Sequence, residues 1–187
     1  MQKEKRKMAV FDTTYDVIVV GGGHAGSEAA RIAARMGAST LLITQNLPSI
    51  AQMSCNPAMG GIAKGQIVRE IDALGGYSGI VTDMTGIQFK MLNMSKGPAM
   101  WSPRAQCDKY RFSEQWRLEL EHTDGLDLFA DTVTGVKVDN SGTVTGVKTS
   151  LGVEIGCRTL ILTNGTFLNG IIHIGEKQYG GGRIAEP

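Results

Sequence analysis

Cysteine is scarce in this sequence, and its spacing excludes two kinds of site. Cys55, Cys107 and Cys157 are the only three among 187 residues. An odd and sparse set argues against a disulfide framework, and no C-x-x-C pair marks a metal site. We therefore expect no bound metal.

Net charge and long apolar runs are also nearly absent. The formal net charge of +1 gives no global attraction to nucleic acid, so any nucleic-acid site must be a local patch. No apolar run approaches the roughly 20 residues needed to span a bilayer. Residues 1–14 are basic without a long apolar region behind them, which favours a flexible basic tail over a secretory signal. We expect a cytoplasmic protein without membrane contact.

Glycine, in contrast, is abundant, and its main cluster follows an apolar run. Residues 16–20, DVIVV, are rich in β-branched side chains and predict a buried strand of a parallel sheet. The next six residues, Gly21-Gly22-Gly23-His24-Ala25-Gly26, fit the pattern G-x-G-x-x-G. In that pattern Gly21 allows a tight turn, Gly23 lets the backbone approach a pyrophosphate, and Gly26 lets a helix sit close to the strand.

The residues after the glycines complete a nucleotide-binding unit. Residues 27–37 are Ala-rich with apolar residues at helical spacing, and residues 40–44, TLLIT, predict the second parallel strand. The helix N-terminus offers free N–H groups and a positive dipole end to a phosphate. This context favours a dinucleotide site over a glycine-rich turn without a ligand.

The end of the second predicted strand bears on which dinucleotide binds. An NAD site usually carries Asp or Glu there, to bind the ribose hydroxyl groups. This chain has Thr44, Gln45 and Asn46, and no acidic residue between Glu28 and Glu70. A neutral amide can still bond a ribose, so the pattern only tilts the prediction from a dehydrogenase towards FAD.

The rest of the chain alternates irregular loops with regular segments. Predicted loops cover residues 45–63 and 93–104, and predicted helices cover residues 64–76 and 104–125. We expect Ile67, Val68, Ile71 and Leu74 to share one face of the first helix, and Tyr110, Trp116, Leu118 and Leu120 to form the apolar stripe of the second. Residues 86–92, GIQFKML, fit either a strand or the start of a helix.

The last third of the chain predicts strands in an informative order. A buried strand at 126–130 precedes three segments at 132–139, 143–150 and 153–158, and a further parallel strand at 159–166 ends in T-N-G-T. This order resembles the FAD domain of the two-dinucleotide-binding flavoproteins, whose last loop closes over the flavin nucleotide. The expected fold class is α/β: a Rossmann-like FAD-binding domain with a β-meander and long insert loops, over residues 15–187.

Three unusual loops narrow the resemblance. They are SCNPAMGGIAKG at 54–65, SKGPAMWSPRAQCD at 95–108 and GTFLNGIIHIGEKQYGGGR at 165–183. Together with GGGHAGSEAA they resemble the tRNA uridine 5-carboxymethylaminomethyl modification enzyme family, MnmG or GidA. The resemblance implies a homodimer that holds FAD, takes electrons from NADH and uses methylenetetrahydrofolate. With the GTPase MnmE, such an enzyme modifies C5 of the wobble uridine of certain tRNAs.

The chain departs from this family in two respects. Met100-Trp101-Ser102-Pro103 precede Arg104 where family members usually carry a basic run, which leaves Arg104 as the main charge there. Family members are also much longer. We therefore expect residues 15–187 to be an incomplete FAD-binding domain that alone holds FAD poorly and catalyses nothing.

Candidate site residues follow from the motif and from the resemblance. The expected FAD-binding residues are Gly21, Gly22, Gly23, His24, Ala25, Gly26, Gln45, Val133, Thr163 and Gly165. The backbone of Val133 should bond the adenine ring, by analogy with the fold. Three basic residues, Lys64, Lys96 and Arg104, are candidates for tRNA phosphates, although ordinary solvated surface explains each one equally well. Trp101 could stack on a base or simply fill its loop.

Cys55 is the candidate nucleophile, because by the resemblance its loop faces the flavin. A thiolate there could add to C6 of uracil and activate C5, and Lys64 could lower the pKa of the thiol. The alternative is a partly buried loop cysteine. Cys107 and Cys157 are expected to be small apolar fillers in a helix and a strand, respectively.

Three other functions are compatible with the sequence. A sister flavoprotein family methylates another tRNA uridine with the same folate, and the CNPAMGG loop favours the first family over it. A small-molecule flavin oxidoreductase would share the FAD domain. The isolated chain could also be an inactive nucleotide-binding fragment.

Overall fold

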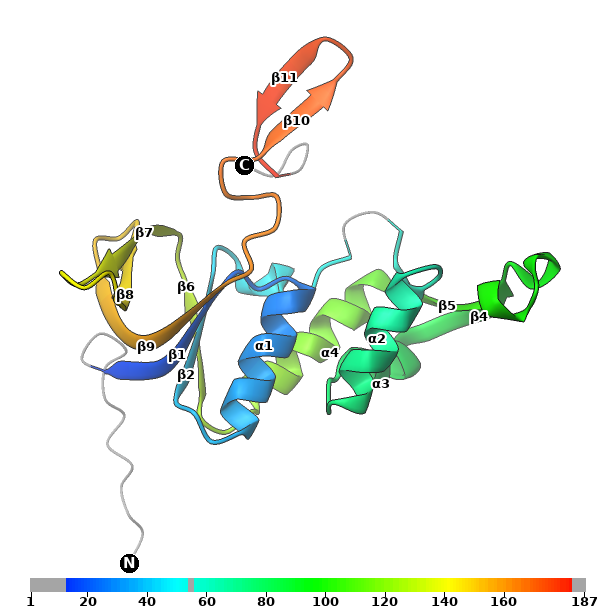
Figure 1. Cartoon of the computed structure of the whole chain (residues 1–187), viewed down its shortest axis with the longest axis horizontal. Coiled ribbons are helices and arrows are strands. Elements are labelled where there is room, and N and C mark those ends of the chain that lie inside the picture. The colour runs from blue at the N-terminus through cyan, green and yellow to red at the C-terminus, as the bar shows by residue number, and fades with distance from the viewer. Residues whose placement is uncertain (1–12, 54–55, 183–187) are drawn as a thin grey trace, which may run out of the picture.

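A computed structural model describes residues 13–53 and 56–182 of the chain (Figure 1). Its centre is a six-stranded sheet, four strands of which are parallel. In sheet order the strands are β6 (Leu126–Ala130), β2 (Thr40–Thr44), β1 (Thr14–Val20), β9 (Glu154–Leu162), β8 (Val144–Thr149) and β7 (Val133–Val138). The predicted strands at 16–20, 40–44 and 126–130 are confirmed as β1, β2 and β6.

Strand β9 corrects the prediction of two separate segments at 153–158 and 159–166. It is one continuous strand that serves two ladders. Its first residues pair antiparallel with β8, with Gly156 beside Gly146, and the residues from Gly156 onward pair parallel with β1, with Ile161 beside Val19. The β-meander and the last parallel strand are therefore joined without a turn, which fixes the end of β9 next to the end of β1.

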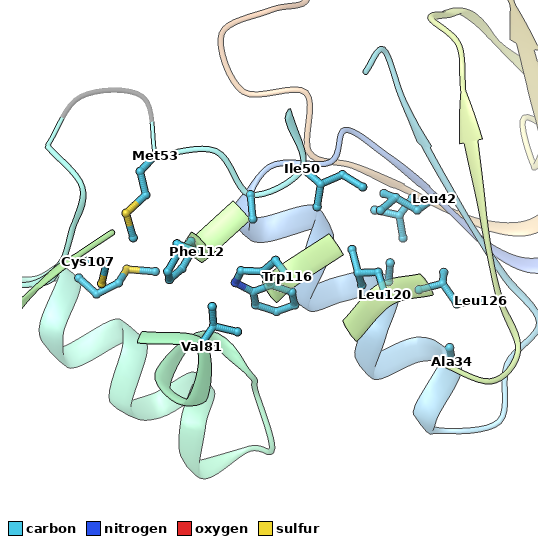
Figure 2. Packing of buried hydrophobic residues seen from close by; sticks show 14 of the residues in the cluster. Ala34, Leu42, Ile50, Met53, Val81, Cys107, Phe112, Trp116, Leu120 and Leu126 are labelled. Carbon is cyan, nitrogen blue, oxygen red and sulfur yellow. The ribbon is translucent and has the colours of Figure 1, made fainter. Parts of the chain in front are cut away.

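Two helices cover one face of the central sheet. They are α1 (His24–Arg35), which directly follows the glycine motif, and α4 (Lys109–Glu121). Figure 2 shows Phe112, Trp116 and Leu120 in a row along α4, within a core that also holds Leu42 and Ile50. Burying these large side chains removes apolar surface from water at roughly 25 cal/mol per Å². This core fixes α1 and the loop after β2 against the sheet.

Helix α4 differs from its prediction in where it begins and in which face it buries. Residues 102–107 form strand β5 instead, and the helix begins after Asp108, whose carboxylate accepts hydrogen bonds from the N–H groups of Tyr110 and Arg111. Trp116 and Leu120 are buried as predicted, but Tyr110 is 80% exposed and Leu118 is also exposed. The buried face follows an i, i+4 row that starts at Phe112, since helical residues four apart lie above one another.

The other side of the central sheet holds a second apolar cluster. It joins Ile18, Leu41 and Ile43 of β1 and β2 with Val147 and Ile155 of β8 and β9, which belong to the same sheet. At its margin the Tyr15 hydroxyl donates to Asp127 Oδ2 at 2.8 Å, and burial raises the pKa of Tyr15 well above its usual range. Strands β1 and β2 are thus buried on both faces, as their β-branched sequences predict.

A smaller three-stranded sheet lies beyond the helices, in the order β3-β5-β4. Its strands are β3 (Ala58–Gly60), β4 (Gly86–Leu92) and β5 (Ser102–Cys107), and helices α2 (Lys64–Ala73) and α3 (Ser78–Thr85) pack beside it. The segment GIQFKML is therefore a strand. The two predicted loops, at 45–63 and 93–104, contain short 3-10 turns at Leu47–Ser49, Met94–Lys96 and Pro98–Met100. These loops were also predicted too long, because β3 lies within the first and β5 begins within the second.

Helix α2 is confirmed, but its predicted apolar face is not fully buried. Ile67 is exposed, and Leu74 is 82% exposed. Within the described residues, the only fully buried position of α2 is Gly65. The apolar periodicity of this helix therefore marks a surface that the described chain does not itself cover.

Polar contacts from α1 hold α3 and α4 in place. The Glu28 carboxylate accepts hydrogen bonds from the N–H groups of Tyr77 and Ser78, at the start of α3. Arg31, which is buried, pairs with Glu119 of α4 at 2.6 Å and lies over the Tyr77 ring. An acceptor at a helix N-terminus satisfies N–H groups that have no partner within the helix. No local sequence pattern indicates these contacts, because their partners lie far apart along the chain.

A short hairpin ends the described chain. It consists of β10 (Ile171–Ile174) and β11 (Lys177–Gly180), and it projects from the body beyond the end of β9 (Figure 1). None of the helices in the described part of the chain is long and apolar enough to cross a membrane.

Candidate dinucleotide-binding site

The glycine motif lies at the carboxyl ends of the parallel strands. Strand β1 has β2 on one side and β9 on the other, so the strand order changes direction there. In open α/β sheets, ligands bind at this kind of switch point, outside the carboxyl ends of the strands. The structure brings the predicted residues after β1, β2, β6 and β9 to this one edge.

Gly21 and Gly22 form the turn, and neither has room for a side chain. Gly21 has φ +104°, and a Cβ there would lie 2.6 Å from the carbonyl oxygen of Thr163. A Cβ at Gly22 would lie 2.9 Å from Thr44 Oγ1. The Gly21 N–H donates to the Ile43 carbonyl at 2.8 Å, which ties the turn to β2. These two glycines are required by the protein's own packing.

Gly26 and Gly23 have opposite surroundings. A Cβ at Gly26 would lie 1.8 Å from the carbonyl oxygen of Gly21, so α1 can cross β1 this closely only with glycine there. A Cβ at Gly23 would meet nothing within 4 Å, and Gly23 is exposed. No contact within the described residues requires glycine at position 23. The open space over it is what a ligand that approaches the backbone needs.

The N-terminus of α1 borders that open space. Gly23 is the N-cap of the helix and supplies no side-chain cap, and the first intrahelical bond runs from Ser27 N–H to the Gly23 carbonyl. The preceding N–H groups, at His24, Ala25 and Gly26, have no partner within the helix and lie at the positive end of its dipole. Backbone donors, a positive dipole end and an open approach together fit a pyrophosphate.

Thr163 holds the end of β9 onto the glycine turn. Its N–H donates to the Val20 carbonyl at 2.8 Å, and its hydroxyl lies 2.9 Å from the carbonyl oxygens of both Val20 and Gly21. Its side chain is therefore used to position the turn. Gly165, two residues on, is exposed with φ +56°, and a Cβ there would meet nothing within 4 Å. It leaves the loop backbone open to a ligand, as at Gly23.

Gln45 and Val133 occupy the other predicted positions at this edge. Gln45 directly follows β2 and is exposed, whereas Val133 begins β7 and packs against the second apolar cluster. Between them lies Asp131, which the sequence reasoning did not single out. The Asp131 N–H donates to the Thr44 carbonyl, and its carboxylate accepts from the N–H of Thr132 and the hydroxyl of Ser150.

Asp131 thus joins the ends of β6 and β2 to the turn after β8. Burial raises the pKa of this carboxyl, but hydrogen bonds, chiefly from Ser150, outweigh burial and hold the pKa below its usual value. An ionised carboxylate that accepts several hydrogen bonds fixes the path of the chain into Val133. The sequence signal that could have identified Asp131 is the presence of an acidic residue directly after a predicted buried strand.

His24 is a neutral residue beside the turn. Burial lowers the pKa of its imidazole, and the nearby charge of Lys64 lowers it further. The ring meets Phe112 edge-on at 5.6 Å, and its buried Nδ1 has no hydrogen-bond partner among the described residues. The lowered pKa favours the neutral form of the His24 imidazole.

The three predicted tRNA-binding cations lie in or near the smaller sheet, and the charge of Lys64 also reaches His24 of the glycine motif. Lys64 begins α2 and donates to the Ala58 carbonyl of β3 at 3.3 Å. Arg104 lies in β5, directly between Gly60 of β3 and Lys90 of β4. Lys96 stands apart, in the turn at the tip of the β4–β5 hairpin (Figure 1). The structure brings Lys64 and Arg104 to one sheet but leaves Lys96 separate.

The turn before α2 is strained. Ala63 has φ +65° and ψ −58°, and the Lys64 N–H donates to the Ile62 carbonyl at 2.9 Å. These values define a γ-turn of the rare kind with positive φ, a costly conformation for a residue with a side chain. The strain lies in one of the three loops that carry the family resemblance.

The cysteines divide into two groups. Cys55 lies outside the described residues. Cys107 and Cys157 are buried free thiols, and burial raises the pKa of each, so both are poor nucleophiles. Cys157 is in a strand as predicted, whereas Cys107 is in strand β5 rather than a helix. No group of three metal-ligating side chains occurs within 13–53 and 56–182.

Comparison with known proteins agrees with this geometry. The family model described as glucose inhibited division protein A matches residues 16–187. The chain is 68% identical over 177 residues to the tRNA uridine 5-carboxymethylaminomethyl modification enzyme MnmG of Flavobacterium johnsoniae, and 67% identical to that of Christiangramia forsetii. Each alignment covers 95% of this chain and 28% of the relative. The chain thus spans little more than a quarter of the length of these relatives.

Solved structures show the same fold. GidA of Aquifex aeolicus matches with a TM-score of 0.88 and 54% identity, over 96% of this chain and 30% of that one. A probable FAD-dependent monooxygenase, pqsL of Pseudomonas aeruginosa, is only 15% identical, with a TM-score of 0.57 over 79% of this chain and 42% of that one, and shows the fold alone. The predicted Rossmann-like α/β class is confirmed. With a family model matched over residues 16–187, the chain belongs to the glucose inhibited division protein A family, GidA.

Proposed function

We propose that this chain provides the FAD-binding site of an enzyme that modifies C5 of the wobble uridine of tRNA. The observation that carries the proposal is the contrast among the motif glycines. Gly21, Gly22 and Gly26 are required by the fold, whereas Gly23 is open to a ligand. The family supplies the reaction class, since the relatives bear the name of a tRNA uridine modification enzyme.

The residues at the sheet edge fit the parts of FAD. The diphosphate binds the backbone N–H groups at the start of α1, over Gly23. The exposed Gln45 amide is placed after β2, where a ribose hydroxyl is bound in this fold. The backbone at Val133 meets the adenine, and the open loop at Gly165 borders the flavin half. No acidic side chain directly follows β2, which favours FAD over NAD at this site.

Bound FAD would supply two-electron redox chemistry, with NADH as reductant and methylenetetrahydrofolate as the source of the one-carbon unit. The chain's own candidate group is Cys55. Its thiolate adds to C6 of uracil, and the electron pair released to C5 attacks the methylene carbon of the folate iminium, whose C=N electron pair moves to nitrogen, so that C5 carries a folate-bound methylene group. Loss of the C5 proton and departure of the thiolate from C6 then restore the aromatic ring.

The polymer substrate and the protein partners belong to the same proposal. Lys64 and Arg104 supply positive charge near the smaller sheet, and Lys96 adds a charge at the hairpin tip, where tRNA phosphates would contact them. The protein acts as a homodimer and together with a GTPase of the MnmE type. A small-molecule flavin oxidoreductase is the alternative, and its turnover would not depend on tRNA or folate.

Two measurements test this function. The full-length protein should bind FAD and show flavin absorbance after gentle purification with added FAD. Cells that lack the gene should lose the 5-carboxymethylaminomethyl group from their tRNA, as measured by nucleoside mass spectrometry. Retention of that nucleoside at the wild-type level, or NADH oxidation that ignores tRNA and folate, would contradict the proposal.

A further inference from the structure

The imidazole of His24 is a titratable group beside the glycine turn to which the function described above gives no role. His24 is the first residue of α1, so its backbone N–H is one of the donors without a partner in the helix. Covalent geometry keeps the ring nitrogens within about 6 Å of that backbone nitrogen in any rotamer. A diphosphate that binds these donors over Gly23 is therefore also close to the imidazole.

The His24 ring is poorly solvated, and one of its nitrogens has no partner. The ring meets Phe112 of α4 edge-on, with 5.6 Å between the ring centroids, and Phe112 is fully buried. The Nδ1 atom of His24 is buried and makes no hydrogen bond to any described residue. Charges placed near such a group act on it with little screening by water. The described chain therefore provides no hydrogen bond that fixes the protonation state of Nδ1.

The surroundings of this ring are positive before a ligand binds. Burial, and then the nearby charge of Lys64 at the start of α2, lower the pKa of the imidazole, and the α1 dipole has its positive end here. Glu28, one turn along α1, acts in the opposite direction, but its carboxylate already accepts hydrogen bonds from the N–H groups of Tyr77 and Ser78. Helix α4 contributes the uncharged ring of Phe112. The ring thus has no nearby carboxylate that is free to pair with it among these groups.

We propose that His24 takes up a proton when the FAD diphosphate binds, so that FAD affinity rises as the pH falls. The inference rests on the FAD site proposed above and gives the His24 side chain a role in it. The diphosphate carries two negative charges. At about 8 Å from the ring, and with an effective dielectric constant of about 20, two such charges favour the protonated imidazole by about tenfold or more. The proton comes from the solvent, and no other covalent bond changes.

The direction of the pH dependence follows from linkage. Because the imidazole pKa is higher in the complex than in the free protein, the added affinity is fully present below the pKa of the free protein. It is lost as the pH rises through the pKa of the complex. We expect FAD to bind about tenfold more tightly, or better, at about pH 5.5 than at about pH 8, the range in which histidine titrates. The diphosphate of FAD stays fully ionised throughout this range.

Isothermal titration calorimetry counts the proton directly. Full-length apoprotein is titrated with FAD at about pH 6.5, the ordinary pKa of histidine, in PIPES and in Bis-Tris, which differ in ionisation enthalpy. The difference between the two observed enthalpies gives the number of protons taken up for each FAD bound. We expect about half a proton or more for wild type, since a nearby opposite charge shifts a pKa by roughly one to three.

Two variants remove the titrating group and keep a polar side chain. His24→Asn and His24→Gln should both bind FAD, but the proton count should fall by the wild-type amount and the affinity should change less with pH. His122→Asn is the matched control. His122 is exposed at the C-terminal end of α4, the far end of this helix from Phe112, so its replacement should leave the proton count unchanged. Circular dichroism checks that each variant is folded.

ADP-ribose locates the effect within the dinucleotide, because it carries the diphosphate without the flavin ring. Its binding to wild type should also take up a proton. Uptake with FAD but not with bound ADP-ribose would place the proton at the flavin half and overturn the proposal.

Equal proton counts in wild type, His24→Asn and His24→Gln would also overturn it, as would wild-type FAD affinity that is constant or rises with pH. These results differ from a failure of the proposed function, in which FAD does not bind or binds away from Gly23.

Discussion

Substituting alanine for Gly23 and for Gly26 should have opposite consequences for stability and binding. Gly23 has φ −72° and ψ −174°, which any residue can adopt, and its Cβ would meet nothing within 4 Å. Gly23→Ala should therefore change the free energy of unfolding by no more than about 1 kcal/mol, the usual range for N-cap substitutions. At Gly26 the new Cβ would lie 1.8 Å from the Gly21 carbonyl oxygen. Gly26→Ala must displace α1 from β1 and should cost about 3 kcal/mol or more.

Binding of FAD should respond to Gly23→Ala instead. A methyl group over the turn holds the diphosphate away from the backbone donors at the start of α1. Losing one or two charge-assisted hydrogen bonds at about 1.5–3 kcal/mol each corresponds to at least a tenfold weaker affinity, since about 1.4 kcal/mol is a factor of ten. Gly180→Ala is the matched control, because Gly180 also has open space around its Cβ but lies in the β10–β11 hairpin, which projects from the body (Figure 1).

The assay combines urea unfolding with FAD titration followed by flavin fluorescence. We expect Gly23→Ala to be stable but deficient in FAD binding, and Gly180→Ala to match wild type in both respects. The placement of the diphosphate would be refuted if Gly23→Ala bound FAD with a dissociation constant within a factor of about three of wild type. That factor corresponds to a change in binding free energy of less than about 1 kcal/mol. If Gly26→Ala had the same free energy of unfolding as wild type, the inferred close contact between α1 and β1 would be refuted.

Three further predictions concern the γ-turn, the carboxylate behind the site and the nucleophile. Ala63→Gly should raise the free energy of unfolding by about 1 kcal/mol in urea unfolding, because glycine relieves the φ +65° strain at a smaller entropic cost; a loss of stability would show that the turn is not strained. The lowered pKa of Asp131 means that its contribution is present above the unfolded-state pKa and is lost as the pH falls through the folded-state pKa. Asp131→Asn should therefore destabilise the protein at neutral pH and reduce the fall in stability as the pH is lowered into the acid range, and unchanged pH dependence would contradict this reasoning. Cys55→Ser should abolish formation of the modified nucleoside in tRNA while flavin absorbance is retained, and near-normal modification would remove Cys55 from the chemistry.

The first βαβ unit could be predicted because its determinants are local. The apolar run ending at Val20, the glycines that follow and the Ala-rich helix each need only their neighbours in sequence to be interpreted. The same holds for Gly26, whose closest contact is with the Gly21 carbonyl, whereas the close contact of Gly21 is with Thr163 of β9, far along the chain. Gly23 was assigned to the ligand by the motif, and the empty space around it agrees.

Errors arose where distant packing decides the structure. Residues 104–107 have helical character, but pairing with Gly60 and with Lys90 makes them the middle strand of a sheet. Tyr110 and Leu118 were assigned to the apolar stripe of α4, but both are exposed. Apolar periodicity alone does not determine which face of a helix is buried. Likewise, Asp131 has partners at Thr44, Thr132 and Ser150, and of these only the neighbour Thr132 could have been anticipated.

A structure of the protein determined with FAD would test the proposed site without any intermediate assumption. We predict that the diphosphate lies over Gly23, within hydrogen-bond distance of the backbone N–H groups at the start of α1. The adenine should lie on the side of Val133 and the flavin on the side of Gly165. A diphosphate bound anywhere else on the chain would contradict the assignment of the glycine turn to FAD.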